Sequence, residues 1–118
     1  MELTLDAIKS AGAYTGAPVR KEIEWRSNDE QHKAWINVQL SSYDTAMREF
    51  EVQREGGDVL VARIVAGVVD PQGVPIFTKR DVAGDPETGE GKMCASLFFA
   101  LITAVNEANG YVVKEAKN

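Results

Sequence analysis

The sequence predicts a single α+β domain over residues 1–118, with two antiparallel β-hairpins packed against about three helices in the order α-β-β-α-β-β-α. Three observations predict this class. Apolar residues alternate with a period of two in two early segments, they recur at helical spacing in others, and turn residues separate the segments. The length of 118 residues suits one hydrophobic core, and no repeat or long linker divides the chain.

The N-terminal third is predicted to form a short helix followed by a β-hairpin. Thr4 is a suitable N-cap and Gly12 a suitable C-terminal stop, which places the helix over residues 5–11. Residues 19–25 and 33–40 then alternate apolar and polar side chains, as half-buried strands do. A polar turn joins these two strands, and the pair is therefore predicted to be antiparallel.

A second helix is predicted to begin after the hairpin. Ser41 and Asp44 have the spacing of a capping box, and Gly56-Gly57 ends the helix. Three apolar side chains recur along it at helical spacing: Tyr43, Met47 and Phe50.

The apolar run over residues 58–69 fits either a buried strand or a buried helix. Its many valine and isoleucine residues are β-branched, which favours the strand. Asp70-Pro71-Gln72-Gly73 has the residue preferences of a type I turn, and it would connect this strand to a second one over 74–78. The spacing of Thr78 and Asp81 predicts another capping box, with a short helical turn from Lys79.

The last helix is predicted over residues 92–109, with Asn109-Gly110 as its stop, and the tail beyond about residue 113 is expected to be frayed. A helical wheel gives it one broad apolar face that should pack on a sheet. The residues of that face are Met93, Cys94, Leu97, Leu101, Ala104, Val105 and Ala108.

No motif in the chain predicts catalysis, a cofactor or a metal. The only histidine, His32, lies in the polar turn with no marked partner. The segment before Gly91-Lys92 departs from a phosphate-binding loop, since Pro86 replaces the required glycine and Met93 follows the lysine. Four carboxylates near this segment lack the spacing of a calcium loop and are expected to be solvated: Asp81, Asp85, Glu87 and Glu90. Cys94, the only cysteine, is expected to be a core residue.

The charge and hydropathy of the chain limit its partners and its compartment. The net charge of −5 argues against nonspecific binding of nucleic acid. The longest apolar segment is about a dozen residues, well below the roughly 20 that span a bilayer. We therefore expect a soluble protein of the cytoplasm that binds neither nucleic acid nor membrane.

Two aromatic residues interrupt the expected polar surfaces. Phe99 falls on the polar face of the last helix, with Ile102 and Ala95 at the edge of that face, and Trp35 opposes the apolar residues of its strand. Such side chains are covered either by this chain or by a partner. We take Phe99, Ile102, Ala95 and Trp35 as candidate partner contacts, with internal packing as the alternative.

The order of segments resembles the tail assembly chaperones of long-tailed phages and prophages. The resemblance covers nearly the whole chain, and its best marks are VVDPQGVPIF followed by TKRDV, and the closing helix that ends in VNEANG. It implies a non-enzymatic protein that binds the largely helical tape measure protein, keeps it soluble and promotes assembly of the tail tube around it. It also implies host cytoplasm as the location and absence from the mature virion.

The resemblance suggests further partners as well. Many such chaperones have a longer form, made by ribosomal frameshifting, which recruits the tail tube protein. Several copies of the chaperone would bind along one tape measure chain, and the chaperone could also form a homo-oligomer with other copies of itself. The alternative is a structural tail component, either a tube or a completion protein, that stays in the virion.

Overall fold

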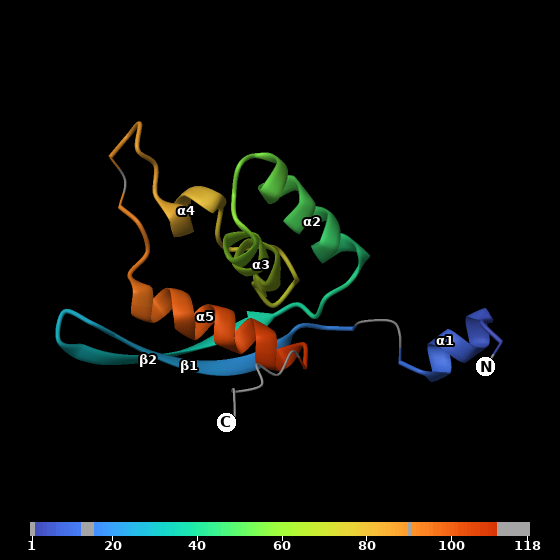
Figure 1. The fold of residues 1–118 in the computed structure, drawn as a ribbon. Helices are drawn as coiled ribbons and strands as arrows, with labels where there is room; N and C mark the ends of the chain where they lie inside the picture. The colour runs from blue at the N-terminus through green and yellow to red at the C-terminus, as the bar shows by residue number, and fades with distance from the viewer. Residues whose placement is uncertain (1, 13–15, 90, 111–118) are drawn as a thin grey trace, which may run out of the picture.

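The computed structural model describes residues 2–12, 16–89 and 91–110 and confirms the α+β class. The order of elements differs in part from the predicted one (Figure 1). The elements are α1 (Leu5–Ser10), β1 (Val19–Ser27), β2 (Glu30–Val38), α2 (Tyr43–Arg54), α3 (Val59–Gly67), β3 (Val68–Val69), α4 (Lys79–Ala83) and α5 (Ala95–Ala108).

The predicted first hairpin is present, and its strands reach further toward the turn than expected. β1 and β2 pair antiparallel in a continuous register from Val19 opposite Val38 to Ser27 opposite Glu30. The connecting residues Asn28 and Asp29 have positive φ angles of 52° and 61°. Such angles suit the tight turns that match the twist of two paired strands.

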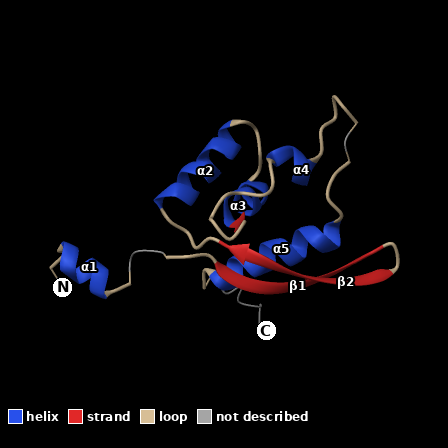
Figure 2. Ribbon diagram, turned by 180° about the vertical axis from the view of Figure 1, so that it is seen from behind, coloured by secondary structure: helices blue, strands red, loops and turns tan. Residues whose placement is uncertain are grey.

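The hairpin offers one face to the rest of the protein. α5 lies along that face, and α2, α3 and α4 lie beyond it on the same side (Figure 2). Side chains alternate between the two faces of a strand. Ile23 and Trp25 of β1, with Ala34 and Ile36 of β2, therefore join the core, while the neighbouring side chains face away from α5.

The segment predicted as a valine-rich strand is a helix, α3, except for its last two residues. Its N-cap is Asp58, whose carboxylate accepts a hydrogen bond from the Val61 backbone N–H at 2.8 Å. Six of its nine residues are buried, from Val61 to Gly67 with only Arg63 more accessible. The prediction of a strand was wrong because burial on nearly all sides outweighs the modest β preference of valine and isoleucine.

The second hairpin is correspondingly smaller than predicted. Only Val68 and Val69 form a strand, β3, and this strand pairs with the end of β2 to complete the order β1-β2-β3. The predicted turn is present, since the Gly73 N–H donates to the Asp70 carbonyl at 2.9 Å. Beyond the turn, a single bridge joins Val69 to Pro75, flanked by hydrogen bonds from the Asp70 N–H to the Val74 carbonyl at 2.8 Å and from the Ile76 N–H to the Val68 carbonyl at 3.3 Å. The backbone nitrogen of Pro75 points away from β3, which suits proline on a sheet edge.

The predicted starts of two helices were wrong, and that of a third is confirmed. The capping box of α2 is formed by Ser42 and Thr45, one residue later than the predicted Ser41 and Asp44. The capping box of Thr78 and Asp81 at α4 is confirmed. α5 begins at Ala95, three residues later than predicted.

Candidate partner-binding surfaces

Of the four predicted contact residues, only Phe99 and Ala95 lie close together on one exposed surface. Phe99 on α5 is 59% exposed and Ala95, one turn earlier, is also exposed. Ile102 is only 6% exposed and packs in the hydrophobic core, so it is not accessible to a partner in this conformation. Trp35 is 57% exposed, but it lies on the face of the sheet that points away from α5.

Trp35 lies in a polar environment on its face of the sheet. The guanidinium of Arg20 lies 5.2 Å from the centre of the indole ring, a cation–π contact. Glu22 is its direct neighbour across the hairpin. Trp35 is thus partly covered by its own strands, although most of its surface remains open.

Phe99 lines a groove between α5 and β1. The groove has a volume of about 330 Å³ and is lined on the strand side by Glu22, Ile23 and Glu24. Its helix side is formed by residues that follow one another at helical spacing: Ser96, Phe99, Ala100, Thr103, Ala104 and Glu107. The sequence showed that Phe99 was unusually placed, but only the packing of α5 on β1 reveals the groove.

Two contacts hold α5 against β1 at opposite ends of this groove. At one end the Arg26 backbone N–H donates a hydrogen bond to the Ser96 hydroxyl at 2.9 Å. At the other end the Lys21 ammonium and the Glu107 carboxylate form an ion pair at 3.4 Å. The groove is therefore set by the fold before any partner binds.

A second exposed apolar surface lies on α2 and was missed as a contact surface. Tyr43, Met47 and Phe50 are 77%, 45% and 58% exposed and follow one another at helical spacing, so they form a stripe along one side of the helix. The opposite side of α2 carries the buried Thr45 and Val52 and packs toward α3. The spacing was visible in the sequence, but spacing alone does not tell which side of a helix is covered.

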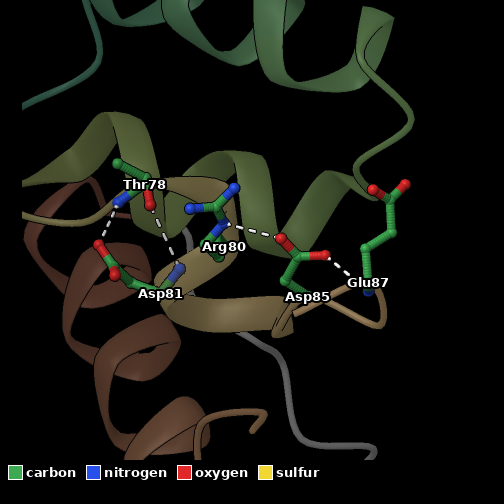
Figure 3. Close-up of polar contacts among 5 residues, drawn as sticks. All are labelled: Thr78, Arg80, Asp81, Asp85 and Glu87. Atoms are coloured by element: carbon green, nitrogen blue, oxygen red, sulfur yellow. Dashed lines mark hydrogen bonds and ion pairs between the residues drawn. The ribbon is translucent and has the colours of Figure 1, made fainter. Parts of the chain in front are cut away.

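The acidic segment after α4 is occupied with internal contacts (Figure 3). Asp81 accepts a hydrogen bond from the Thr78 backbone N–H at 2.8 Å, and Asp85 forms an ion pair with Arg80 at 3.1 Å. Asp85 also accepts a hydrogen bond from the Glu87 N–H at 2.9 Å. Across the described residues, which do not include Glu90, no group of three potential ligands is placed to hold a metal ion.

The capping contacts also change the acidity of Asp81. Hydrogen bonds from the backbone of Thr78 and then from its side chain, together with the charge of Arg80, lower the pKa of Asp81 below its ordinary value of 3.8. These contacts favour the ionised carboxylate because all of them stabilise negative charge. The shift thus has a structural cause at the start of α4.

The two other residues considered for catalysis or metal binding are Cys94 and His32. Cys94 precedes α5 as its N-cap residue and is exposed, so the expectation that it lies in the core was wrong. His32 stacks on Trp25 across the hairpin, with ring centres 5.2 Å apart. No described helix is long and apolar enough to cross a membrane.

The comparison with known families identifies the chain. Residues 6–109 match the family described as phage tail assembly chaperone, TAC. The match covers most of the 118 residues, and the chain therefore belongs to the phage tail assembly chaperone family. This family implies a non-enzymatic role with protein partners in tail assembly. No curated protein and no solved structure matches the chain.

Proposed function

We propose that this chaperone binds the tape measure protein of its phage, keeps it soluble and promotes assembly of the tail tube around it. It would act in the host cytoplasm without catalysing a reaction, and it would leave before the virion matures. Membership of the family supports the assembly role. The more specific support is the apolar surface that the fold leaves uncovered on α2 and α5.

The stripe of Tyr43, Met47 and Phe50 is the observation that carries this proposal. Three large apolar side chains in a row along one helix are typical of a surface on which an amphipathic partner helix packs. Met47 adds an adaptable side chain, which suits a partner whose sequence varies along its length. The stripe would cover apolar faces of a largely helical tape measure protein that otherwise aggregates.

Phe99, Ala95 and Trp35 are proposed as further contacts because each is exposed. Ile102 is left out because it belongs to the core. Since Phe99 and Trp35 lie on opposite faces of the sheet, one partner helix cannot cover both. A tape measure protein that contacts both would have to wrap around the hairpin or bind two copies of the chaperone.

Co-expression with the tape measure protein of the same genome tests the proposal. We expect the wild-type chaperone to keep the tape measure protein in the soluble fraction and to elute with it in size-exclusion chromatography. The double variant Met47→Asp/Phe50→Asp should lose this effect while its circular dichroism stays unchanged. Ile76→Asp is the matched control, because Ile76 is similarly exposed but lies after β3.

Two outcomes would contradict the proposal. If the tape measure protein stayed insoluble and the chaperone eluted alone, the proposed binding of the tape measure protein would be wrong. Detection of the chain in purified virions by mass spectrometry would instead favour a structural tail component. Light scattering on the complex would report how many copies of the chaperone bind one tape measure protein. A longer frameshifted form, which would recruit the tube protein, should appear as a second and larger product when the intact gene is expressed.

A further inference from the structure

We propose that the free edge of β1, together with the Phe99 groove, binds an extended peptide segment as an additional strand of the sheet. This goes beyond the proposed function, because it adds the free edge of β1 and assigns the groove at Phe99, named above only as a further contact, to an extended partner instead of a helical one. It requires no assumption about the α2 stripe. The occupant we infer has apolar residues on the side that faces α5 and basic residues on the other side.

The backbone of β1 supplies the first argument. β1 is the outer strand of the order β1-β2-β3, so in the described structure only one of its two edges is paired. The Arg26 N–H points to the free edge, since it donates to Ser96 and not to β2. In an antiparallel ladder, residues whose backbone groups point outward alternate with those that point to the partner strand. The N–H and C=O groups of Glu22 and Glu24 therefore face the free edge as well.

The groove beside this edge supplies the second argument. A strand added to β1 would lie under the side of α5 that carries Phe99 and Thr103. Every second side chain of the added strand would point toward that helix, because side chains alternate along a strand. Phe99, which is otherwise 59% exposed, would then be covered by an apolar side chain of the partner. Backbone hydrogen bonds and an apolar pocket are the two parts of recognition by strand addition.

Two carboxylates at the middle of the edge, which lie between Arg20 and Arg26 on the same face, define the other side of the occupant. Glu22 and Glu24 project from the face of the sheet that points away from α5. The Glu24 carboxylate lies 3.7 Å from the Lys33 ammonium and accepts a hydrogen bond from the Gln31 side-chain amide at 3.3 Å, and half of the Glu24 side chain remains exposed. Opposite charges across adjacent strands stabilise a sheet, and like charges destabilise it. Lysine or arginine opposite Glu22 and Glu24 is thus the favoured composition.

A second copy of the chain fits this edge poorly. α5 packs mainly on β1 and reaches its free edge through Ser96. Two copies paired through β1 would place their β1 strands about 4.8 Å apart, and each would bring its own α5 over them. Packed helices need about 8–10 Å between their axes. A single extended segment avoids this conflict because it brings no helix.

A synthetic peptide tests the inference directly. The probe is a fluorescein-labelled peptide of sequence Thr-Val-Lys-Val-Lys-Val-Thr, in which valines would face α5 and lysines would face Glu22 and Glu24. The sequence reads the same in both directions, so it tests parallel and antiparallel addition together. We expect saturable binding in fluorescence anisotropy and slower hydrogen exchange at the Glu22 and Glu24 amides. Replacing both lysines by glutamate should weaken binding at least tenfold.

Variants of the protein separate strand addition from charge attraction. Glu24→Pro removes an outward N–H that the β1–β2 ladder does not use, and proline is tolerated on such an edge. It should abolish binding, whereas Glu24→Ala, which keeps the N–H, should retain it in weakened form. Phe99→Ser should weaken binding, and Ile76→Ser, a similarly exposed residue outside the groove, should leave it unchanged.

Three outcomes would overturn the inference. The first is no saturable binding of the lysine peptide, and the second is equal binding by Glu24→Pro and Glu24→Ala. The third is a dimer of the chaperone alone in light scattering that Glu24→Pro dissociates, which would assign the edge to a second copy. None of these outcomes touches the tape measure assay with the α2 variants, so the two proposals fail separately.

Discussion

Truncation of Ile64 tests whether α3 is the central buried helix. Its side chain is fully buried in the core. Ile64→Ala removes three carbon atoms, and at about 0.8 kcal/mol each the lost transfer free energy is about 2.4 kcal/mol. The cavity left behind adds to this, so the free energy of unfolding should fall by about 3–4 kcal/mol. That is a large share of the roughly 5–15 kcal/mol that stabilises a domain.

Urea unfolding followed by tryptophan fluorescence measures this loss, because the half-buried Trp25 packs against the same core. Val59→Ala is the control, since Val59 begins the same helix but is half exposed, and it should cost less than about 1 kcal/mol. Ile64→Val should lie between the two, at about 0.5–1.5 kcal/mol. If Ile64→Ala cost no more than Val59→Ala, the central position of α3 would be refuted.

Two further predictions concern the ends of elements. Asp29 has a φ of 61°, where glycine is more favourable, so Asp29→Gly should raise the melting temperature; an unchanged or lower value in calorimetry would contradict the turn geometry. Asp81→Asn should lower the melting temperature at pH 7, because the contacts that lower the pKa of Asp81 stabilise its ionised form. Since the folded pKa lies below the ordinary one, this stabilisation is complete well above pH 3.8, declines near that value and disappears as the pH falls through the folded value. Melting curves of both proteins should converge in acid, and a difference that persists there would disprove the linkage.

The sequence predicted best where local chemistry determines the structure. The alternation in β1 and β2 was sufficient for the hairpin, and the side chains of Thr4, Thr78 and Asp81 marked two helix starts. The N-cap of α2 was predicted one residue too early, because Ser41 and Ser42 are adjacent and both carry a hydroxyl that can cap a helix. In the structure the Ser42 hydroxyl accepts the hydrogen bond from the Thr45 N–H.

The errors arose where tertiary packing decides. The run now seen as α3 has no alternation to separate helix from strand, and its burial on nearly all sides depends on elements distant in the chain. The same holds for the candidate surfaces. Phe99 was recognised because it is an aromatic residue on the otherwise polar face of its helix. Ile102 is buried, and a helical wheel could not predict this because it does not show which other elements pack beside Ile102.

The short helix α1 has a thermodynamic consequence for any binding event that involves it. None of its six residues is buried, and both ribbon views draw it away from the sheet and the other helices (Figures 1 and 2). Isolated helices below about 12–15 residues are marginal in water, even with a good cap. A partner that holds α1 as a helix must therefore offset the conformational entropy that α1 loses. Contacts to the exposed Leu3 and Leu5 would then add less affinity than the area of these side chains suggests.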